Sequence, residues 1–254
     1  MNTTVWVKRS LAAVALMGAV SAQAATVIDF DTDSAGNTLS AGTAITNQYA
    51  ADGVTFHNTQ TYIKNSTSEL ADLMVFDTAN PTGGDSDLAT PGSHSTNNVP
   101  LGNVLIISED NNASNPDDLG GGGSFEIQLD PSKQYRVDNV TFLDIEDHRA
   151  DGVARNANNS TFMSLLDSDK NLIGSKYWVT GLGDNSVETL DINVSGAQYM
   201  FFSFHTSGAL AGFELTSQAV AASEPAALAL MSLGLAGLMI TRRRNRALEN
   251  QRNH

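Results

Sequence analysis

The segment Phe125-Glu126-Ile127-Gln128-Leu129 is the most informative about the fold, together with the Asp-Pro-Ser-Lys sequence that follows it at residues 130–133. Its apolar residues alternate with polar ones, which is the period of a β-strand that buries one face. The next four residues are typical of a turn, because Asp and Pro favour the conformations that reverse the chain. This part of the chain therefore predicts a half-buried strand that ends in a turn.

The same alternation recurs along the chain, and turn residues separate the segments that carry it. It is found at residues 28–30, 54–56, 190–192, 200–204 and 211–215. Residues 104–107 instead form a continuous apolar run, which predicts a strand buried on both faces. With residues 135–145 and 173–179, the set amounts to roughly ten to eleven short strands.

The number and kind of these segments predict the fold class. Only residues 66–73 are expected to hold a helical turn or two. Many short strands without βα alternation favour an all-β fold, an antiparallel β-sandwich of the jelly-roll type, with an up-and-down barrel as the alternative. We expect six phenylalanines to be buried between the two sheets: Phe30, Phe56, Phe125, Phe142, Phe202 and Phe213.

The N-terminus has the pattern of a secretory signal peptide. Lys8 and Arg9 precede an apolar segment at residues 11–20, and Ala22-Gln23-Ala24 is a small-x-small cleavage site. We therefore expect residues 1–24 to be removed on export. The remaining body at residues 25–222 has the length of one domain.

The C-terminus carries three consecutive elements: the motif Ser223-Glu224-Pro225, an apolar run at residues 226–240, and the basic cluster Arg242-Arg243-Arg244. The apolar run predicts a single short transmembrane helix, since about 20 residues cross a bilayer. The arginines are expected on the cytoplasmic side. A polar tail at residues 247–254 follows, and an ordinary membrane anchor is the alternative interpretation.

This C-terminal arrangement at residues 223–246 resembles the PEP-CTERM sorting signal of Gram-negative bacteria, with Ser223 in place of the first proline. The resemblance implies processing by a membrane-embedded exosortase, a transient inner-membrane intermediate, and a final location at the cell surface or in the exopolysaccharide matrix. We accordingly expect an exosortase-type enzyme and extracellular polysaccharide as partners.

The charge of the body limits its functions. The chain has a net charge of −14, and the terminal segments hold seven of its 14 basic but only two of its 28 acidic residues, which leaves a body of about −19. Such a domain repels nucleic acid. The absence of cysteine excludes thiol catalysis, cysteine-bound zinc and iron–sulfur chemistry. Bound cations and simple solubility both remain explanations of the acidity.

Acidic residues gather at expected strand ends and in glycine-rich loops, where they predict a calcium site. Calcium takes six to eight oxygen ligands, which carboxylates and carbonyls supply. The spacing is not that of an EF-hand, and solvated turns with Asx caps are the alternative. Magnesium is less expected because it keeps its waters. The candidate ligands are Asp77, Asp85, Asp87, Glu109, Asp117, Asp118 and Asp144.

The order of these acidic motifs also resembles an exported bacterial ectodomain family that often accompanies PEP-CTERM signals. The motifs are Phe76-Asp77, Gly84-Asp85-Ser86-Asp87-Leu88, Leu105-Ile106-Ile107-Ser108-Glu109, Pro116-Asp117-Asp118, the glycine run at residues 120–123, and Asp144-Ile145-Glu146. The resemblance covers about residues 28–215. It implies no established activity.

These observations favour a non-enzymatic surface or matrix protein with an adhesive or structural role and calcium-stabilised loops. The alternative is a carbohydrate-binding or glycan-processing module displayed by the same route. Asp144, Glu146 and Glu109 are the carboxylates that a glycosidase could use, and His148 and His205 are expected to be structural or surface residues. Glycan-stacking candidates are Tyr62, His57, Tyr177 and Trp178, of which the last two point to opposite faces of one strand.

Overall fold

The computed structural model describes residues 25–57, 61–64, 67–146, 160–218 and Gly234. The expected signal peptide, the sorting motif with its arginine cluster, and the polar tail lie outside these residues, as does His148. Among the residues that are described, no helix has the length and apolar character needed to cross a membrane.

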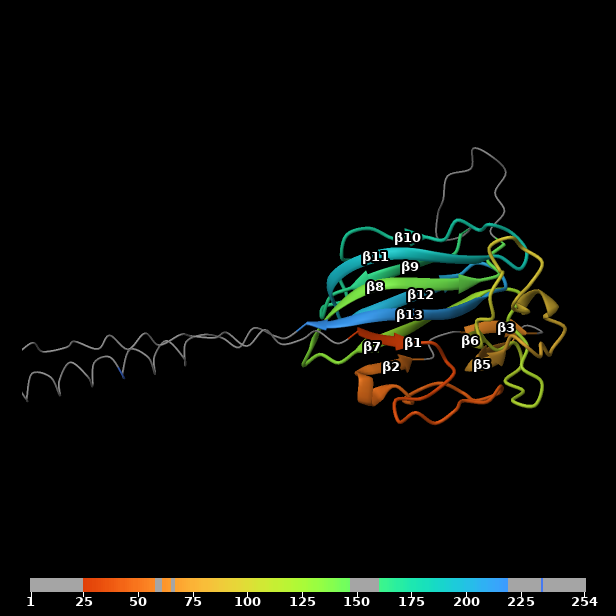
Figure 1. Ribbon diagram of the computed structural model, residues 1–254, viewed down its shortest axis with the longest axis horizontal. Coiled ribbons are helices and arrows are strands. Elements are labelled where there is room, and N and C mark those ends of the chain that lie inside the picture. The colour runs from red at the N-terminus through yellow and green to blue at the C-terminus, as the bar shows by residue number, and fades with distance from the viewer. Residues whose placement is uncertain (1–24, 58–60, 65–66, 147–159, 219–233, 235–254) are drawn as a thin grey trace, which may run out of the picture.

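The body is all-β and contains two antiparallel sheets, as expected (Figure 1). The six-stranded sheet has the order β11 (Val187–Ala197), β8 (Gln134–Leu143), β13 (Ala209–Gln218), β6 (Asn103–Ile107) and β5 (Leu73–Asp77), with β1 (Ala25–Ile28) also paired to β13. The five-stranded sheet has the order β10 (Tyr177–Trp178), β9 (Phe162–Leu166), β12 (Tyr199–Phe204), β7 (Gly123–Leu129) and β2 (Val54–His57). The strands thus form two separate sheets and not the closed sheet of an up-and-down barrel.

Four short elements complete the described fold. The strands β3 (Thr61–Lys64) and β4 (Thr67–Leu70) pair with each other as a two-stranded sheet. The 3₁₀ turns η1 (Ala50–Asp52) and η2 (Ser86–Leu88) lie in loops. The helical turn expected at residues 66–73 is therefore wrong: its described part contains β4 and the beginning of β5. Thr and Ser are weak helix formers, and pairing with β3 decides the conformation.

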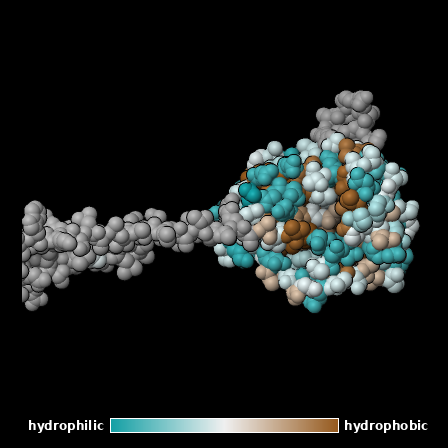
Figure 2. Space-filling model, viewed as in Figure 1, coloured by the Kyte–Doolittle hydropathy of each residue, from teal (hydrophilic) through white to brown (hydrophobic). Residues whose placement is uncertain are grey.

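The hydrophobic core lies between the two sheets, which pack as a sandwich. All six phenylalanines expected there are buried and belong to one continuous cluster. Phe202 of β12 stacks on Phe125 of β7 with ring centroids 4.9 Å apart, and lies 6.2 Å from Phe142 of β8 in the other sheet. The expectation that residues 104–107 are buried on both faces is also confirmed. On the face visible in Figure 2, hydrophobic residues are scattered among hydrophilic ones.

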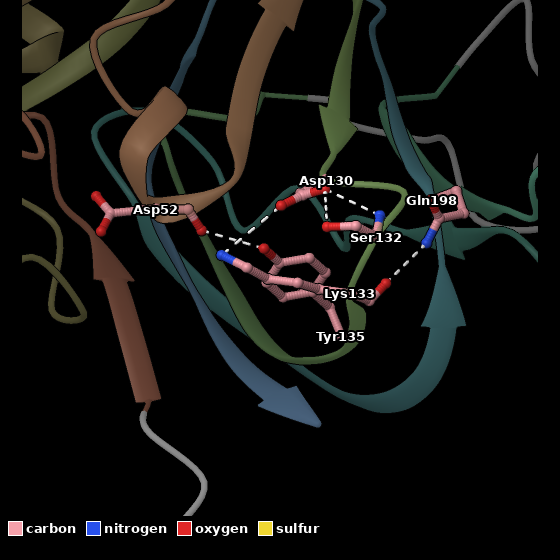
Figure 3. A network of polar contacts seen from close by, with 6 residues as sticks. All are labelled: Asp52, Asp130, Ser132, Lys133, Tyr135 and Gln198. Atoms are coloured by element: carbon pink, nitrogen blue, oxygen red, sulfur yellow. Dashed lines mark hydrogen bonds and ion pairs between the residues drawn. The ribbon is translucent and has the colours of Figure 1, made fainter. Parts of the chain in front are cut away.

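The turn that follows β7 is held by polar contacts (Figure 3). Asp130 accepts hydrogen bonds from the backbone and hydroxyl of Ser132, and the Tyr135 hydroxyl donates to the Asp52 carbonyl at 3.2 Å. Gly53 has a φ of +84°, and a Cβ there would lie 2.0 Å from the Tyr135 hydroxyl oxygen. The turn predicted at residues 130–133 is present, and glycine at position 53 lets the loop around Asp52 approach Tyr135.

The opposite end of the sandwich gathers the acidic loops. Because β8 pairs antiparallel with both β11 and β13, the last residue of β8 lies beside the first residues of β11 and β13 at one end of the sandwich. In Figure 1 this is the right-hand end, where the loops around residues 81–97 and 180–186 also lie, while β13 ends on the left. The fold therefore brings residues that are far apart in sequence to one edge.

Candidate metal centre

The structure brings five of the seven predicted calcium ligands into two groups of carboxylates. In each group, three residues offer one carboxylate oxygen apiece, and these oxygens lie within 4.8 Å of one another. The first group is Asp85, Asp117 and Asp118, and the second is Asp87, Asp144 and Asp184. Asp184 is a residue that sequence reasoning missed.

Two other predicted ligands have different surroundings. Asp77 closes a turn, where its carboxylate accepts hydrogen bonds from the backbone of Ala79 at 2.9 Å and the side chain of Asn80 at 2.8 Å. Glu109 belongs to neither group, although its backbone N–H donates to the Asp117 carbonyl at 2.9 Å. The structure therefore places Asp77 in a capping role, and Glu109 beside the first group.

The second group is built from three separate segments. Asp87 belongs to η2, Asp144 follows the last residue of β8, and Asp184 lies in the loop that leads into β11. Asp144 has a φ of +58°, a backbone conformation that is rare for a residue with a side chain. Its N–H donates to the Ser186 carbonyl at 2.7 Å, which joins the end of β8 to that loop.

Asp144 has one carboxylate oxygen without a partner. Its side chain is fully buried, at 0% exposure, and its Oδ1 accepts a hydrogen bond from the backbone N–H of Asn185. Its Oδ2 has no hydrogen-bond partner among the described residues, and neither has the buried Oδ1 of Asp87. Because an unpaired buried carboxylate is costly, these two oxygens make the second group the stronger candidate for a cation site.

Asn185 holds the surrounding loops together. Its Nδ2 donates to the carbonyls of Asp87 and Ala89, and its Oδ1 accepts from the backbone N–H of Ser93 at 2.6 Å. Asn185 is 3% exposed and has a φ of +56°. No pattern in the sequence points to this residue, since asparagine in a loop ordinarily predicts only a turn.

The contact between these loops depends on a glycine. A Cβ at Gly92 would lie only 1.6 Å from Asn185 Oδ1 and 2.5 Å from Asn97 Nδ2. Asn97 is fully buried, and its Nδ2 donates to the carbonyls of Ala89 and Asn185. Its Oδ1 is a third buried oxygen without a partner in the described part of the chain. Unpaired oxygens thus concentrate on the loops around Asn185.

The burial of Asp144 determines the electrostatics of the second group. Burial is the main cause that raises the pKa of Asp144 to about 8. The Asn185 N–H lowers this pKa, while the charges of Asp87, Glu146 and Asp184 raise it. The three carboxylates therefore repel one another when ionised, and a divalent cation would relieve that repulsion.

The carboxylates of the first group accept hydrogen bonds from neighbouring residues. Asp118 is buried, and its Oδ2 accepts hydrogen bonds from the Ser207 hydroxyl and the Gly208 N–H, each at 2.7 Å. Asp85 Oδ2 accepts from the Asp118 N–H at 2.8 Å. Burial, followed by the charges of Asp118 and Asp117, raises the pKa of Asp85 to about 8. None of the carboxylate oxygens of this group is among the described buried oxygens that lack a hydrogen-bond partner, which distinguishes it from the second group.

Of the residues considered for glycan stacking, Tyr177 and Trp178 do point to opposite faces. Tyr177 packs against the core. Trp178 lies on the outer face with Phe162, at 5.1 Å between ring centroids. Lys176 Nζ lies 3.8 Å from the centroid of Phe162 and covers that ring. The candidate histidines His57 and His205 are both exposed. Nε2 of His57 lies 3.0 Å from Oε1 of Gln128, and the backbone N–H of His205 donates to the Thr161 hydroxyl.

No protein-family model matches the chain, and the comparison with curated proteins finds no match. Similar solved structures include a mutant lectin-binding domain of lectinolysin complexed with Lewis b, at 13% identity over 46% of this chain and 72% of that one, with a TM-score of 0.27. The fucose-binding module SpX-3 of Streptococcus pneumoniae has 13% identity, the same coverage and a TM-score of 0.26. CpGH89CBM32-6 of Clostridium perfringens has 9% identity over 66% and 94%, with a TM-score of 0.28. These values are too low to assign a function to this chain.

Proposed function

We propose that the body is a calcium-binding β-sandwich and that the ion is held by Asp87, Asp144 and Asp184. The observation that carries this proposal is the fully buried Asp144 carboxylate, whose Oδ2 has no partner and which groups with two further carboxylates. Calcium fits this donor set better than magnesium does, because calcium accepts several carboxylates in irregular geometry. The ion would join η2, the end of β8 and the loop before β11.

The functional class that follows is binding and not catalysis. A general acid or nucleophile has to reach its substrate, whereas the Asp144 side chain is fully buried. An ion at this position would instead fix the loops at one end of the sandwich, where a partner can dock. We therefore propose a calcium-stabilised adhesive or matrix protein, with carbohydrate binding as the activity that its loops would serve.

A thermal unfolding experiment tests the metal site. The full-length protein is compared in chelator, in millimolar magnesium and in millimolar calcium. Calcium at a hundredfold excess over its dissociation constant should add about 2.7 kcal/mol of stability. Asp87→Asn should abolish this gain, while Asp85→Asn should keep it, because Asp85 belongs to the other group, in which no described buried carboxylate oxygen lacks a hydrogen-bond partner. An identical melting temperature in chelator and calcium would refute the proposal.

The proposed route to the cell surface rests on the terminal signals. Cleavage after Ala24 and near Ser223-Glu224-Pro225 by an exosortase-type enzyme would release or attach the body outside the inner membrane. Intact-mass analysis of the native exported protein should therefore find both terminal segments missing. Recovery of chains that keep residues 226–254 in the inner membrane would reduce the tail to a plain anchor.

A further inference from the structure

A pocket opens directly beside the proposed calcium ligands. It has a volume of about 430 Å³, and its walls include Ser86, Asp87, Gly92, Ser93, Asp184 and Asn185. Asp87 and Asp184 therefore face the pocket, whereas Asp144 is fully buried. A ligand that enters the pocket would reach the ion from the side of Asp87 and Asp184.

The coordination of calcium leaves room for such a ligand. Calcium takes six to eight oxygens, and three carboxylates that each bind through one oxygen supply only three of them. The remaining positions have to be filled by protein carbonyls, water or a bound ligand. A coordination position that points into the pocket can be occupied either by water or by a bound ligand, because the pocket is open to solvent.

The local charge selects the kind of ligand. Three ionised carboxylates and one Ca²⁺ leave a net charge of about −1, and the charge of Glu146 also acts on Asp144. Neither Lys nor Arg is among the residues that line the pocket in the described structure. An anionic ligand would therefore be repelled. A neutral hydroxyl is favoured because its oxygen can bind calcium while its hydrogen is donated to a carboxylate.

We propose that two neighbouring hydroxyl groups of a neutral sugar complete the calcium coordination in this pocket. This inference rests on the proposed calcium site and names the ligand class of that site. The exposed Ser86 and Ser93 would border the sugar ring, and Asn185 would keep both walls in place through its contacts with Asp87, Ala89 and Ser93. Calcium would thus serve as the recognition element of an acidic domain.

Calorimetric titration of the full-length protein tests the inference. The probes are methyl glycosides of mannose, galactose, fucose and glucose, which present cis and trans hydroxyl pairs, and the sodium salts of glucuronate and galacturonate. At saturating calcium, at least one neutral glycoside should bind and the uronates should bind at least about tenfold more weakly. Chelator should abolish the binding.

Two pocket variants separate this inference from the calcium site itself. Ser86→Tyr and Ser93→Tyr fill the pocket without removing a carboxylate, so they should weaken glycoside binding by about tenfold or more while the calcium affinity stays unchanged. Ser95→Tyr, an exposed residue outside the pocket lining, is the control. Normal calcium binding with no neutral glycoside bound, with uronates bound more tightly, or with glycoside binding that persists in chelator would overturn the inference. Failure to bind calcium would instead refute the proposed function.

Discussion

The backbone N–H of Asn185 donates a hydrogen bond to Oδ1 of Asp144, while Oδ2 of the same carboxylate is buried without a partner in the described part of the chain. One oxygen of this carboxylate is therefore held by the protein, and the group as a whole lies beside Asp87 and Asp184. The cation that we propose between the three carboxylates would compensate an aspartate at a position with no exposure and a φ of +58°.

Replacing Asp144 with asparagine should stabilise the metal-free protein. The introduced asparagine would still accept from the Asn185 N–H, and its amide group would donate to a neighbouring carboxylate, which the Asp144 carboxylate repels once it loses its proton near pH 8. At about pH 8.5 we expect Asp144→Asn to raise stability in chelator by about 1 kcal/mol, or roughly 2–4 °C in melting temperature, and to remove the response to calcium. Asp77→Asn, in a turn outside both groups, is the control that should keep the calcium response.

The pH dependence of the metal-free protein should run opposite to that of an ordinary salt-bridged domain. The pKa values of Asp85 and Asp144 are raised to about 8, so both keep a proton in the folded state that the unfolded chain loses near its ordinary pKa of about 4. The folded state then binds more protons across this window, and the free energy of unfolding falls as the pH rises from about 5 to about 8.

Thermal unfolding in chelator between about pH 5 and about pH 8.5 measures this effect. Asp33, Asp130 and Asp167 have lowered pKa values, so their contributions are already complete at the acidic end and do not change within the window. Calcium should stabilise the protein more at the alkaline end than at the acidic end, because it replaces protons. A melting temperature in chelator that rises across this window would contradict the expectation.

Much of the fold could be predicted from the sequence. The alternation at residues 125–129 and 200–204 identifies strands and their buried faces, because a half-buried sheet imposes a period of two. The short β4 was missed because pairing with β3, and not its own pattern, forms it. For the candidate site, Asp87 was identifiable as an acid in a glycine-rich loop and Asp144 as an acid near a strand end. Asp184 and Asn185 were not, since their roles depend on loops that are distant in the sequence, such as the one that holds Ser93.

The close approach of Gly92 to Asn185 predicts a steric effect. Gly92→Ala would place a Cβ 1.6 Å from Asn185 Oδ1, so one of the two loops has to move. We expect a loss of about 1–3 kcal/mol in stability together with weaker calcium binding. Gly121→Ala is the matched control, because no atom lies within 4 Å of its Cβ position. Equal effects of the two substitutions would argue against a tightly packed site.

Asn185 and Asn193 allow a second matched comparison. Both have a positive φ, but Asn185 is buried and bonds three loop residues, whereas Asn193 is exposed in a bulge of β11. Glycine accepts the backbone conformation at either position. We expect Asn185→Gly to cost about 1 kcal/mol for each hydrogen bond lost and to weaken calcium binding, with Asn193→Gly close to neutral. Chemical denaturation with and without calcium measures both.

Calorimetric titration of calcium into the chelator-treated full-length protein near pH 8 is the sharpest test of the proposed metal site. The structure predicts saturable binding that involves Asp87, Asp144 and Asp184 and is lost in Asp144→Asn, while Asp77→Asn binds like the unchanged protein. Binding of calcium with equal affinity in Asp144→Asn, or no binding to the unchanged protein, would contradict it.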